Sequence, residues 1–397
     1  MKKSSDEICA TPQKITVSTT PSTMPIYPAA VYECETVSQA SELLGGKTEG
    51  FIYQRDGHPN ASALAEQCRE LQGGDELGVH FAQVTSTGMS SLTLALVSHL
   101  NSGDHVLLSQ QLYGRTVRLV KEELSRWGLE YSEVDMSDLE KTQSAIRSNT
   151  RMLIVETIAN PLLHVADLSS LSSIAHANNA ILLVDNTFAT PLITRPMAFG
   201  ADLVMESMSK LLNGHGDVIL GLLCGKSFLA DRVQDATSSW GLTASPFDCW
   251  LASRGMATAH LRLDRAAKNA HALAEWLSEQ SIVRTVYYPG LKSHPTFEMA
   301  RQVLGTTCFG SMVSIEFNGG LPAVNQFIAR SKNIRFCPSL GEIATTVSHP
   351  RSTSHKNMPA ETARKMGITD GLLRISCGVE SFDYLKHEFK AIFSAMD

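Results

Sequence analysis

The chain has 397 residues, a length at which two domains are more usual than one compact core. Its content of 43% hydrophobic and 19% charged residues is that of an ordinary globular protein. The net charge of -6 gives no electrostatic reason to expect nucleic acid or an acidic membrane surface as a partner.

No apolar run approaches the length of a membrane span, and the first residues lack the apolar segment of a signal peptide. The eight cysteines are scattered without a Cys-x-x-Cys pair, which favours free thiols in a reducing cytoplasm over disulfides or a zinc site. We therefore expect a cytoplasmic protein with no membrane partner and no metal.

The first 60 residues are predicted to form an extended arm. Residues 1–50 are polar, rich in Thr, Ser and Pro, and show little periodicity, while residues 50–60 are rich in turn formers. Tyr53 and Arg55 are two residues apart, so their side chains share one face of an extended segment. Both donate hydrogen bonds to anionic oxygens, which makes the pair a candidate phosphate clamp. The alternative is a loop with one surface arginine.

A helix is predicted over residues 60–71, ending at a Gly-Gly pair. An apolar strand then leads from Phe81 into Ser-Thr-Gly88, and a helical pattern covers residues 91–100. A strand, a small-residue turn and a helix direct backbone N–H groups at a phosphate, and those of Gly88 and Met89 are the candidates. A plain turn between a strand and a helix explains the same pattern equally well.

Strands and helices continue to alternate up to about residue 255. The strands are near-continuous apolar runs, which indicates a mostly parallel sheet covered on both faces. The predicted strands cover residues 105–109, 152–156, 180–187, 201–205 and 218–224, with helices at 114–126 and 168–178. Ligands of such sheets bind beyond the carboxyl ends of the strands. The candidate residues at such ends are Gly88, Tyr113, Asn160, Asp185 and Lys210.

Lys210 follows the predicted strand at residues 201–205, between Ser207 and Ser209 and before a Gly-rich turn. A lysine in such a bend can point its amine into a cleft, where loss of water lowers its pKa and makes it a nucleophile toward an aldehyde. Neighbouring hydroxyls and loop N–H groups can hold a phosphate. Pyridoxal 5'-phosphate (PLP), bound as a Schiff base, requires this combination. A solvated surface lysine is the alternative for this stretch taken alone.

The pattern of predicted elements changes after about Gly255. A long helical run is followed by shorter strands and a closing helix, which indicates a smaller α+β domain; these elements cover residues 256–281, 311–317, 372–377 and 384–396. We therefore predict an arm at 1–60, an α/β domain at 61–255 and a C-terminal domain at 256–397. Arg374 alternates with apolar residues on the last strand, so it either pairs internally or binds an anion.

Taken together, these motifs resemble the Cys/Met-metabolism (trans-sulfuration) family of PLP-dependent enzymes. That family includes cystathionine γ-synthase, cystathionine γ-lyase, methionine γ-lyase and the O-acylhomoserine sulfhydrylases. The resemblance runs from about Pro25 to the C-terminus. Its motifs are Tyr53-Gln-Arg55, Ser86-Thr-Gly-Met89, Leu112-Tyr-Gly114, Glu156-Thr157 with Asn160-Pro161, Val184-Asp-Asn-Thr-Phe-Ala189, Ser207-Met-Ser-Lys-Leu-Leu-Asn-Gly-His215 and Leu373-Arg-Ile-Ser376.

The resemblance implies the PLP-dependent transferase fold of the aspartate-aminotransferase type, with PLP bound by the α/β domain. Lys210 would hold PLP as a covalent aldimine and shuttle protons between Cα and Cβ of the substrate. Asp185 would keep the pyridine nitrogen protonated, so that the ring acts as an electron sink. Tyr113 would stack on the ring and serve as an acid or a base.

Further residues are implied to bind the cofactor phosphate and the substrate. The phosphate would be bound by Gly88, Met89, Ser207 and Ser209, and by Tyr53 and Arg55 of a neighbouring subunit. This arrangement implies an obligate dimer, usually paired into a homotetramer. Arg374 would bind the substrate α-carboxylate with two hydrogen bonds, with Asn160 and Ser339 nearby.

Two positions bear on the choice of substrate. Arg118 matches an arginine of cystathionine γ-synthases and γ-lyases and is a candidate substrate residue. Those two activities usually have a glutamate at the position of Ala344, whereas here Glu342 stands two residues earlier, on the same face of an extended segment. His58 and Arg115 also depart from the usual pattern, and we interpret His58 as a core or surface histidine.

The resemblance implies γ-replacement or γ-elimination on an amino acid derived from homoserine or homocysteine. Arg118 favours cystathionine γ-synthase or γ-lyase activity, whereas the missing glutamate keeps O-acylhomoserine sulfhydrylase and methionine γ-lyase activity as alternatives. Two more distant alternatives are another PLP reaction, such as transamination, and a non-catalytic homologue that keeps the fold.

Overall fold

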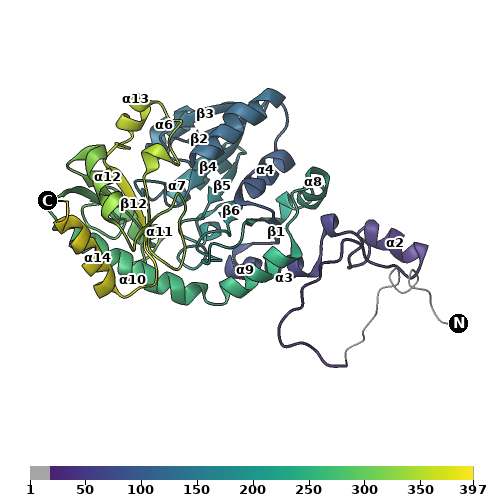
Figure 1. The fold of residues 1–397 in the computed structure, drawn as a ribbon. Coiled ribbons are helices and arrows are strands. Elements are labelled where there is room, and N and C mark those ends of the chain that lie inside the picture. The colour runs from purple at the N-terminus through teal and green to yellow at the C-terminus, as the bar shows by residue number, and fades with distance from the viewer. Residues whose placement is uncertain (1–17, 397) are drawn as a thin grey trace.

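The computed structural model describes residues 18–396. It contains two β-sheets, one of seven strands and one of five, with helices packed around both (Figure 1). The strands of the first sheet are β1 (Phe81–Thr85), β2 (His105–Ser109), β3 (Glu130–Val134), β4 (Thr150–Glu156), β5 (Ile181–Asp185), β6 (Leu203–Ser207) and β7 (Gly221–Gly225). Those of the second are β8 (Val283–Tyr287), β9 (Met312–Phe317), β10 (Arg335–Phe336), β11 (Thr346–Ser348) and β12 (Leu372–Ser376).

The helices precede, connect and follow these strands. They are α2 (Val37–Leu44), α3 (Pro59–Leu71), α4 (Gly88–His99), α5 (Gly114–Arg118), α6 (Leu139–Ser144), α7 (Leu168–Ala177), α8 (Val233–Trp240), α9 (Pro246–Met256), α10 (Ala259–Ser278), α11 (Phe297–Val303), α12 (Gly320–Arg330), α13 (Ala360–Lys365) and α14 (Phe382–Ser394). The long helix α10 leads from the first sheet toward the second along one side of the molecule (Figure 1).

The seven-stranded sheet has the order β1-β7-β6-β5-β4-β2-β3, and only β7 pairs antiparallel with its neighbours. The carboxyl ends of the other six strands therefore meet at one edge. This confirms the α/β fold with a mostly parallel sheet and a smaller C-terminal sheet. The position of the domain boundaries at 60 and 255 stays a prediction.

Both faces of the first sheet are buried, which explains the continuous apolar runs. Along β5, Leu182 and Val184 belong to one hydrophobic cluster, while Leu183 belongs to the cluster on the opposite face. Because side chains alternate across a strand, each strand supplies both clusters. The first cluster also includes Val313 and Ile315 of β9, so one continuous core connects the two sheets.

The structure corrects the prediction of a wholly extended arm. Helix α2 forms within it, and the side chain of Thr36 caps this helix by accepting a hydrogen bond from the backbone N–H of Gln39. No residue of α2 is buried, and this helix lies away from the two sheets (Figure 1). Residues 1–17 of the predicted arm lie outside the described residues. The helix predicted at residues 114–126 is also divided, into α5, a π-helical turn at Leu119–Glu123 and a 3-10 turn at Leu124–Trp127.

Candidate active site

Lys210 lies in a tight turn three residues after β6. Its backbone N–H donates to Ser207 O, and its own carbonyl accepts from Gly214 N–H. Its Nζ donates to Ser339 Oγ at 2.9 Å. Burial lowers the pKa of Lys210, and the nearby charge of Arg374 lowers it further. An amine with a lowered pKa is more often unprotonated and is then a better nucleophile.

The backbone of the loop that carries Ser339 packs closely against the backbone at Lys210 and Leu211. Gly341 has a φ of +81°, and a Cβ at this position would lie 2.7 Å from Leu211 N. Only glycine combines this conformation with this contact at low cost. The turn at Gly341 therefore brings Ser339, from the segment before β11, to the amine of Lys210.

The N-terminus of α4 forms an anion-binding corner beside β6. Thr87 Oγ1 accepts from Ser90 N–H at 2.9 Å, so the N–H groups of Gly88 and Met89 remain at the open end of the helix. A Cβ on Gly88 would lie 2.9 Å from Ser207 Cβ, which places Ser207 against this helix end. Ser209 is different, because its hydroxyl already bonds the backbone N–H and carbonyl of Leu220.

Asp185 is the last residue of β5, and Thr187 holds its carboxylate. The backbone N–H and the hydroxyl of Thr187 both donate to Asp185 Oδ1, at 3.0 and 2.6 Å. The same hydroxyl accepts from Ser207 N–H at 2.9 Å, which links β5 to β6. Burial raises the pKa of Asp185, while the two bonds from Thr187 lower it. Sequence reasoning quoted Thr187 within a motif and assigned it no role.

Glu156 organises the loops that follow β2 and β4, and sequence reasoning also left it without a role. Its Oε1 accepts from Tyr113 N–H at 2.6 Å, and its Oε2 accepts from Asn160 N–H at 3.1 Å. Burial and the neighbouring Asp185 raise the pKa of Glu156 to about 8. An acid at the end of an apolar strand was the signal that could have identified it.

Arg374 is a buried cation that forms no ion pair within residues 18–396. Its Nη1 donates to Asn160 Oδ1 at 2.8 Å, and its Nη2 donates to the carbonyl of Ser339 at 3.1 Å. Its Nε is buried without a hydrogen-bond partner. Burial lowers the pKa of Arg374 to about 10, which still leaves it charged near neutral pH. The carboxyl group of Glu156 acts on this charge without forming an ion pair with it. A buried charge that lacks a direct ion pair is costly, so this position favours an anionic ligand.

Ser339 joins the two halves of the candidate site. Its hydroxyl contacts Lys210 from the first sheet, and its carbonyl contacts Arg374 from the second. Tyr113, 38% exposed, approaches from the loop after β2. The structure thus brings together Lys210, Asn160, Ser339 and Arg374, with Tyr113 tied to Asn160 through Glu156.

Several predicted residues do not join this cluster within one chain. Arg118 Nε donates to Glu122 at 2.5 Å, and the Arg118 side chain is 45% exposed. Tyr53 is 42% exposed and lies under the guanidinium of Arg55, at 5.2 Å from the ring centroid. Nothing within one chain therefore tests the predicted roles of these three residues.

His58 and Glu342, which the sequence comparison with the family singled out, have distinct environments. His58 is buried at the start of α3, where its Nδ1 accepts from Ala61 N–H and its Nε2 bonds the carbonyl of Ala244. It is a core residue that caps a helix. Glu342 lies across from Gly216 and forms an ion pair with Arg335 at 3.0 Å. Its charge acts on Lys210 and raises the pKa of the amine.

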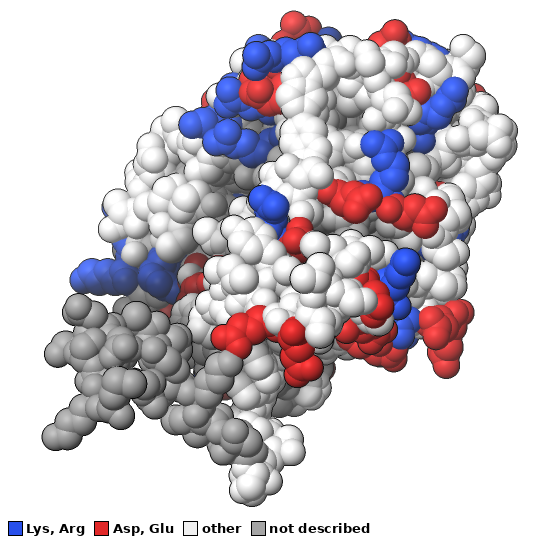
Figure 2. Space-filling view, turned by 90° about the vertical axis from the view of Figure 1, so that its right-hand side faces the viewer, with Lys and Arg blue, Asp and Glu red and all other residues white. Residues whose placement is uncertain are grey.

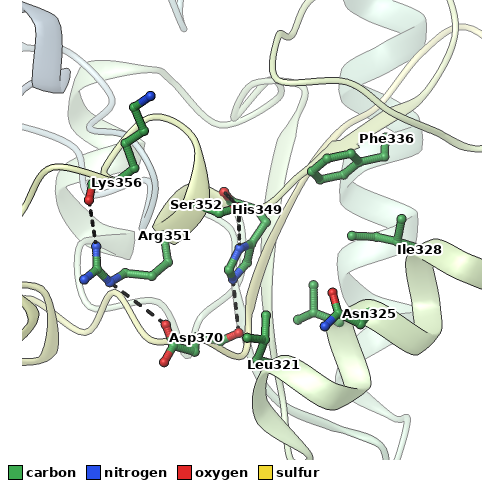
Figure 3. A pocket seen from close by; sticks show the side chains of 10 residues that line it. Leu321, Asn325, Ile328, Phe336, His349, Arg351, Ser352, Lys356 and Asp370 are labelled. Atoms are coloured by element: carbon green, nitrogen blue, oxygen red, sulfur yellow. Dashed lines mark hydrogen bonds and ion pairs between the residues drawn. The ribbon is translucent and has the colours of Figure 1, made fainter.

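A hollow of about 580 Å³ lies elsewhere, between α12 and the segment around the 3-10 turn Pro350–Ser352 (Figure 3). Several of its polar side chains are already paired, both within this segment and with Asp370. His349 contacts Ser352 Oγ and the carbonyl of Asp370, and Arg351 bonds the carbonyl of Lys356 and pairs with the Asp370 carboxylate (Figure 3). None of the predicted cofactor or substrate residues lines this hollow, and we assign it no part in the chemistry.

Comparison with known proteins gives one consistent answer. The model of the family described as "Cys/Met metabolism PLP-dependent enzyme" matches residues 7–394. The chain belongs to this family. It is 37% identical to an L-methionine gamma-lyase of Fusobacterium nucleatum subsp. polymorphum over 363 residues, which cover 91% of this chain and 90% of the relative.

Two further similar proteins are named for other activities. A cystathionine beta-lyase of Lactococcus lactis subsp. cremoris is 37% identical over 368 residues, which cover 92% of each chain. The crystal structure of a cystathionine gamma synthase from Xanthomonas oryzae pv. oryzae, in complex with cystathionine, superposes with a TM-score of 0.86 at 34% identity and covers 94% of this chain and 93% of that chain. The chain is therefore a PLP-dependent enzyme of sulfur amino acid metabolism.

The described residues fit this cofactor. A phosphate needs N–H donors, which the open end of α4 provides, and the glycine at its first position leaves room that a Cβ would fill. An aldehyde needs an amine of lowered pKa, and a protonated ring nitrogen needs a buried carboxylate; Lys210 and Asp185 meet these requirements. Among residues 18–396, no helix is long and apolar enough to cross a membrane.

We predict that R374L weakens the use of the amino-acid substrate and leaves PLP uptake intact. The variant removes charge-assisted hydrogen bonds of about 1.5–3 kcal/mol each, so kcat/KM falls by about 100-fold, mainly through KM. Steady-state kinetics measure this change. R284L is the matched control, because Arg284 lies on β8 and its side chain is 66% exposed. Equal losses in both variants would contradict a direct role of Arg374.

Proposed function

We propose that this enzyme catalyses γ-replacement or γ-elimination on an amino acid derived from homoserine or homocysteine, with the activity of a cystathionine γ-synthase or γ-lyase. One observation carries the proposal: Ser339 contacts both the amine of Lys210 and the buried cation Arg374, which forms no ion pair in the described chain. A carboxylate bound at Arg374 would hold the Cα of an amino acid close to that amine.

PLP, when bound at Lys210, supplies the electron sink that makes protons at Cα and Cβ acidic. The chain's own groups then bind, orient and move protons. Arg374 and Asn160 bind the α-carboxylate, and Asp185 holds the proton on the ring nitrogen. Once the substrate amine has replaced it on the cofactor, Lys210 Nζ, with its lowered pKa, would move protons between Cα and Cβ of the substrate. Tyr113 lies where it can cover the ring and exchange a proton with the substrate.

The phosphate is assigned to the open end of α4, at Gly88 and Met89, with the hydroxyl of Ser207 beside it. The predicted contact of Ser209 is weaker, because its hydroxyl already bonds Leu220 at both of its backbone groups. The first-turn N–H groups and the partial positive charge of the helix end favour a phosphate dianion here.

Tyr53 and Arg55 complete the phosphate site of a neighbouring subunit in this proposal, and the active unit is a dimer within a homotetramer. Three facts support it: helix α2 of the arm lies away from its own sheets (Figure 1), Tyr53 is 42% exposed, and the rings of Trp127 and Trp240 form an exposed pair 5.2 Å apart. Figure 2 shows the face on the side of the arm, where charged groups of both signs are separated by broad uncharged areas. We place the enzyme in the cytoplasm, consistent with seven free cysteines among residues 18–396.

The choice among neighbouring activities rests on Arg118 and Glu342. Arg118, which favours the two cystathionine enzymes, is on the surface and paired with Glu122. Glu342 is the acid closest in sequence to the expected glutamate, and its charge acts on Lys210. It can receive the distal ammonium group of cystathionine or cysteine. If it does not, O-acylhomoserine sulfhydrylase or methionine γ-lyase activity becomes the better description.

The visible spectrum of the purified protein tests the cofactor site. We predict a yellow absorption band that borohydride removes, with the reduced pyridoxyl group recovered on the peptide of Lys210. K210A should bind PLP without this covalent linkage. A protein that stays colourless after PLP is added would leave only the fold.

Product analysis separates the proposed activities. With an O-acylhomoserine and cysteine we expect cystathionine, and with cystathionine alone we expect cysteine, a 2-oxo acid and ammonia. E342A should lower kcat/KM for cystathionine about tenfold, because one partly buried contact to the distal ammonium is lost, and should change that for methionine less. Pyruvate and homocysteine from cystathionine would instead indicate cleavage at Cβ.

Mixed oligomers test the shared phosphate site. R55A and K210A should each be nearly inactive, whereas co-expression of both chains should restore about a quarter of the wild-type activity, because half of the dimers then contain one intact site of two. Separately tagged chains allow the mixed species to be purified. Absence of complementation would place Tyr53 and Arg55 outside the partner's site.

A further inference from the structure

Glu206 is a buried acid on the strand that leads to Lys210, and none of the contacts described above involves it. It is 1% exposed. Because side chains alternate along β6, it lies on the same face of the sheet as Val204, and its hydrogen bond to Gln72 shows that this face meets the end of α3. No lysine, arginine or histidine of the described chain bonds to it.

The hydrogen bonds around Glu206 leave two oxygens without a donor. Its Oε1 accepts from Gln72 Nε2 at 2.7 Å and from Asn186 Nδ2 at 3.1 Å. Its Oε2 and the Oε1 of Gln72 are both buried without a hydrogen-bond partner. Two acceptors cannot satisfy each other. A proton on Glu206 Oε2 would turn this oxygen into a donor for Gln72 and remove both deficits.

The surroundings of Glu206 also favour a proton. The titratable groups that interact electrostatically with it are Cys68 of α3, Cys224 of β7 and Asp185 of β5, and none of them is a cation. Burial raises the pKa of both thiols well above the usual value, so they are neutral. Burial and the charge of Asp185 raise the pKa of Glu206 to about 8.

Glu206 is linked to Asp185 through Asn186, the next residue in the chain. The side chain of Asn186 is held at both ends, because its Oδ1 accepts from Thr157 Oγ1 at 2.7 Å and its Nδ2 donates to Thr194 O and to Glu206. A fixed Asn186 fixes the carboxyl end of β5, where Asp185 begins the loop of the site. An ionised Glu206 would place a second negative charge near Asp185.

We propose that Glu206 is an uncharged carboxylic acid whose hydroxyl donates to Gln72 Oε1, and that this neutral acid–amide pair positions Asn186 and, with it, Asp185. Glu206 is a positioning residue, because it acts on Asp185 and not on the substrate. Because Glu206 is neutral, the carboxylate of Asp185 is the negative charge that faces the ring nitrogen of PLP. This role of Asp185 rests on the proposed function, whereas the protonation of Glu206 does not.

Infrared difference spectroscopy tests the protonation directly. At pH 7 the wild-type protein minus E206Q should show the carbonyl stretch of a protonated carboxylic acid, and the band should shift in D2O. This measurement needs no bound cofactor, so its outcome is independent of the proposed function. A difference spectrum that contains only carboxylate bands would overturn the proposal.

Urea unfolding at several pH values separates Glu206 from an ionised neighbour. Asp202 is also buried but accepts from Lys226 Nζ at 2.7 Å and from His176 Nε2 at 2.9 Å, so D202N is the matched control. A glutamine can replace the donor and the acceptor of a neutral acid, so E206Q should keep the wild-type urea midpoint at pH 5, whereas D202N should lower it. An E206Q midpoint as low as that of D202N would contradict the neutral acid.

The pH dependence of the urea midpoint gives a second test, because the proposal fixes its direction. The pKa of Glu206 in the folded protein lies above the usual 4.5, so its stabilising contribution is present at low pH and is lost as the pH rises through about 8. E206Q lacks this titration. The midpoint of the wild-type protein should therefore fall relative to that of E206Q between pH 5 and pH 8. A constant difference would count against the proposal.

PLP binding tests the positioning role. E206L leaves Gln72 and Asn186 without their acceptor, and its dissociation constant for PLP should rise about tenfold. E206Q should bind PLP as the wild-type protein does, and this rescue distinguishes positioning from bulk packing. Equal affinity in E206L and the wild type would overturn the role, while failure of every variant to bind PLP would instead overturn the proposed function.

Discussion

The buried guanidinium of Arg374 is the constraint on which the candidate site depends. Arg374 belongs to β12, the central strand of the second sheet, and within residues 18–396 its guanidinium donates hydrogen bonds to the side-chain oxygen of Asn160 and the carbonyl of Ser339. Neutral oxygens orient a guanidinium but do not neutralise it. The site is therefore built to be completed by an anion, next to an amine whose pKa is lowered by the same charge.

The parallel sheet supplies the other half of the site for a geometric reason. Strands that run in one direction end at one edge, so loops distant in sequence meet there. Glu156 uses this edge to tie the loops of Tyr113 and Asn160 with one carboxylate, and Thr187 ties Asp185 to β6 with one hydroxyl. These contacts orient the proposed cofactor and substrate residues before any ligand is bound, which reduces the cost of ordering them later.

Sequence reasoning recovered the sheet well, because its strands are buried on both faces and are apolar throughout. It did less well for β3, β8, β10 and β11, which are short or partly exposed and carry mixed residues. It missed α2, a helix of eight residues within a polar stretch that is rich in Thr, Ser and Pro. Arg118 shows a different limit. Its family match predicts a substrate role, yet an exposed arginine four residues from a glutamate pairs within its own helical segment.

The sequence alone determined the alternation of the main strands and helices, the mostly parallel α/β architecture and the lysine, aspartate and arginine that mark the family, because these depend on local pattern and on motifs contiguous in the chain. Only the tertiary structure decided which of them meet. Ser339 contacts Lys210 at a sequence separation of 129 residues, and Gln72 contacts Glu206 at a separation of 134. Such contacts follow from how two sheets and a helix end pack together, and no local pattern encodes that packing.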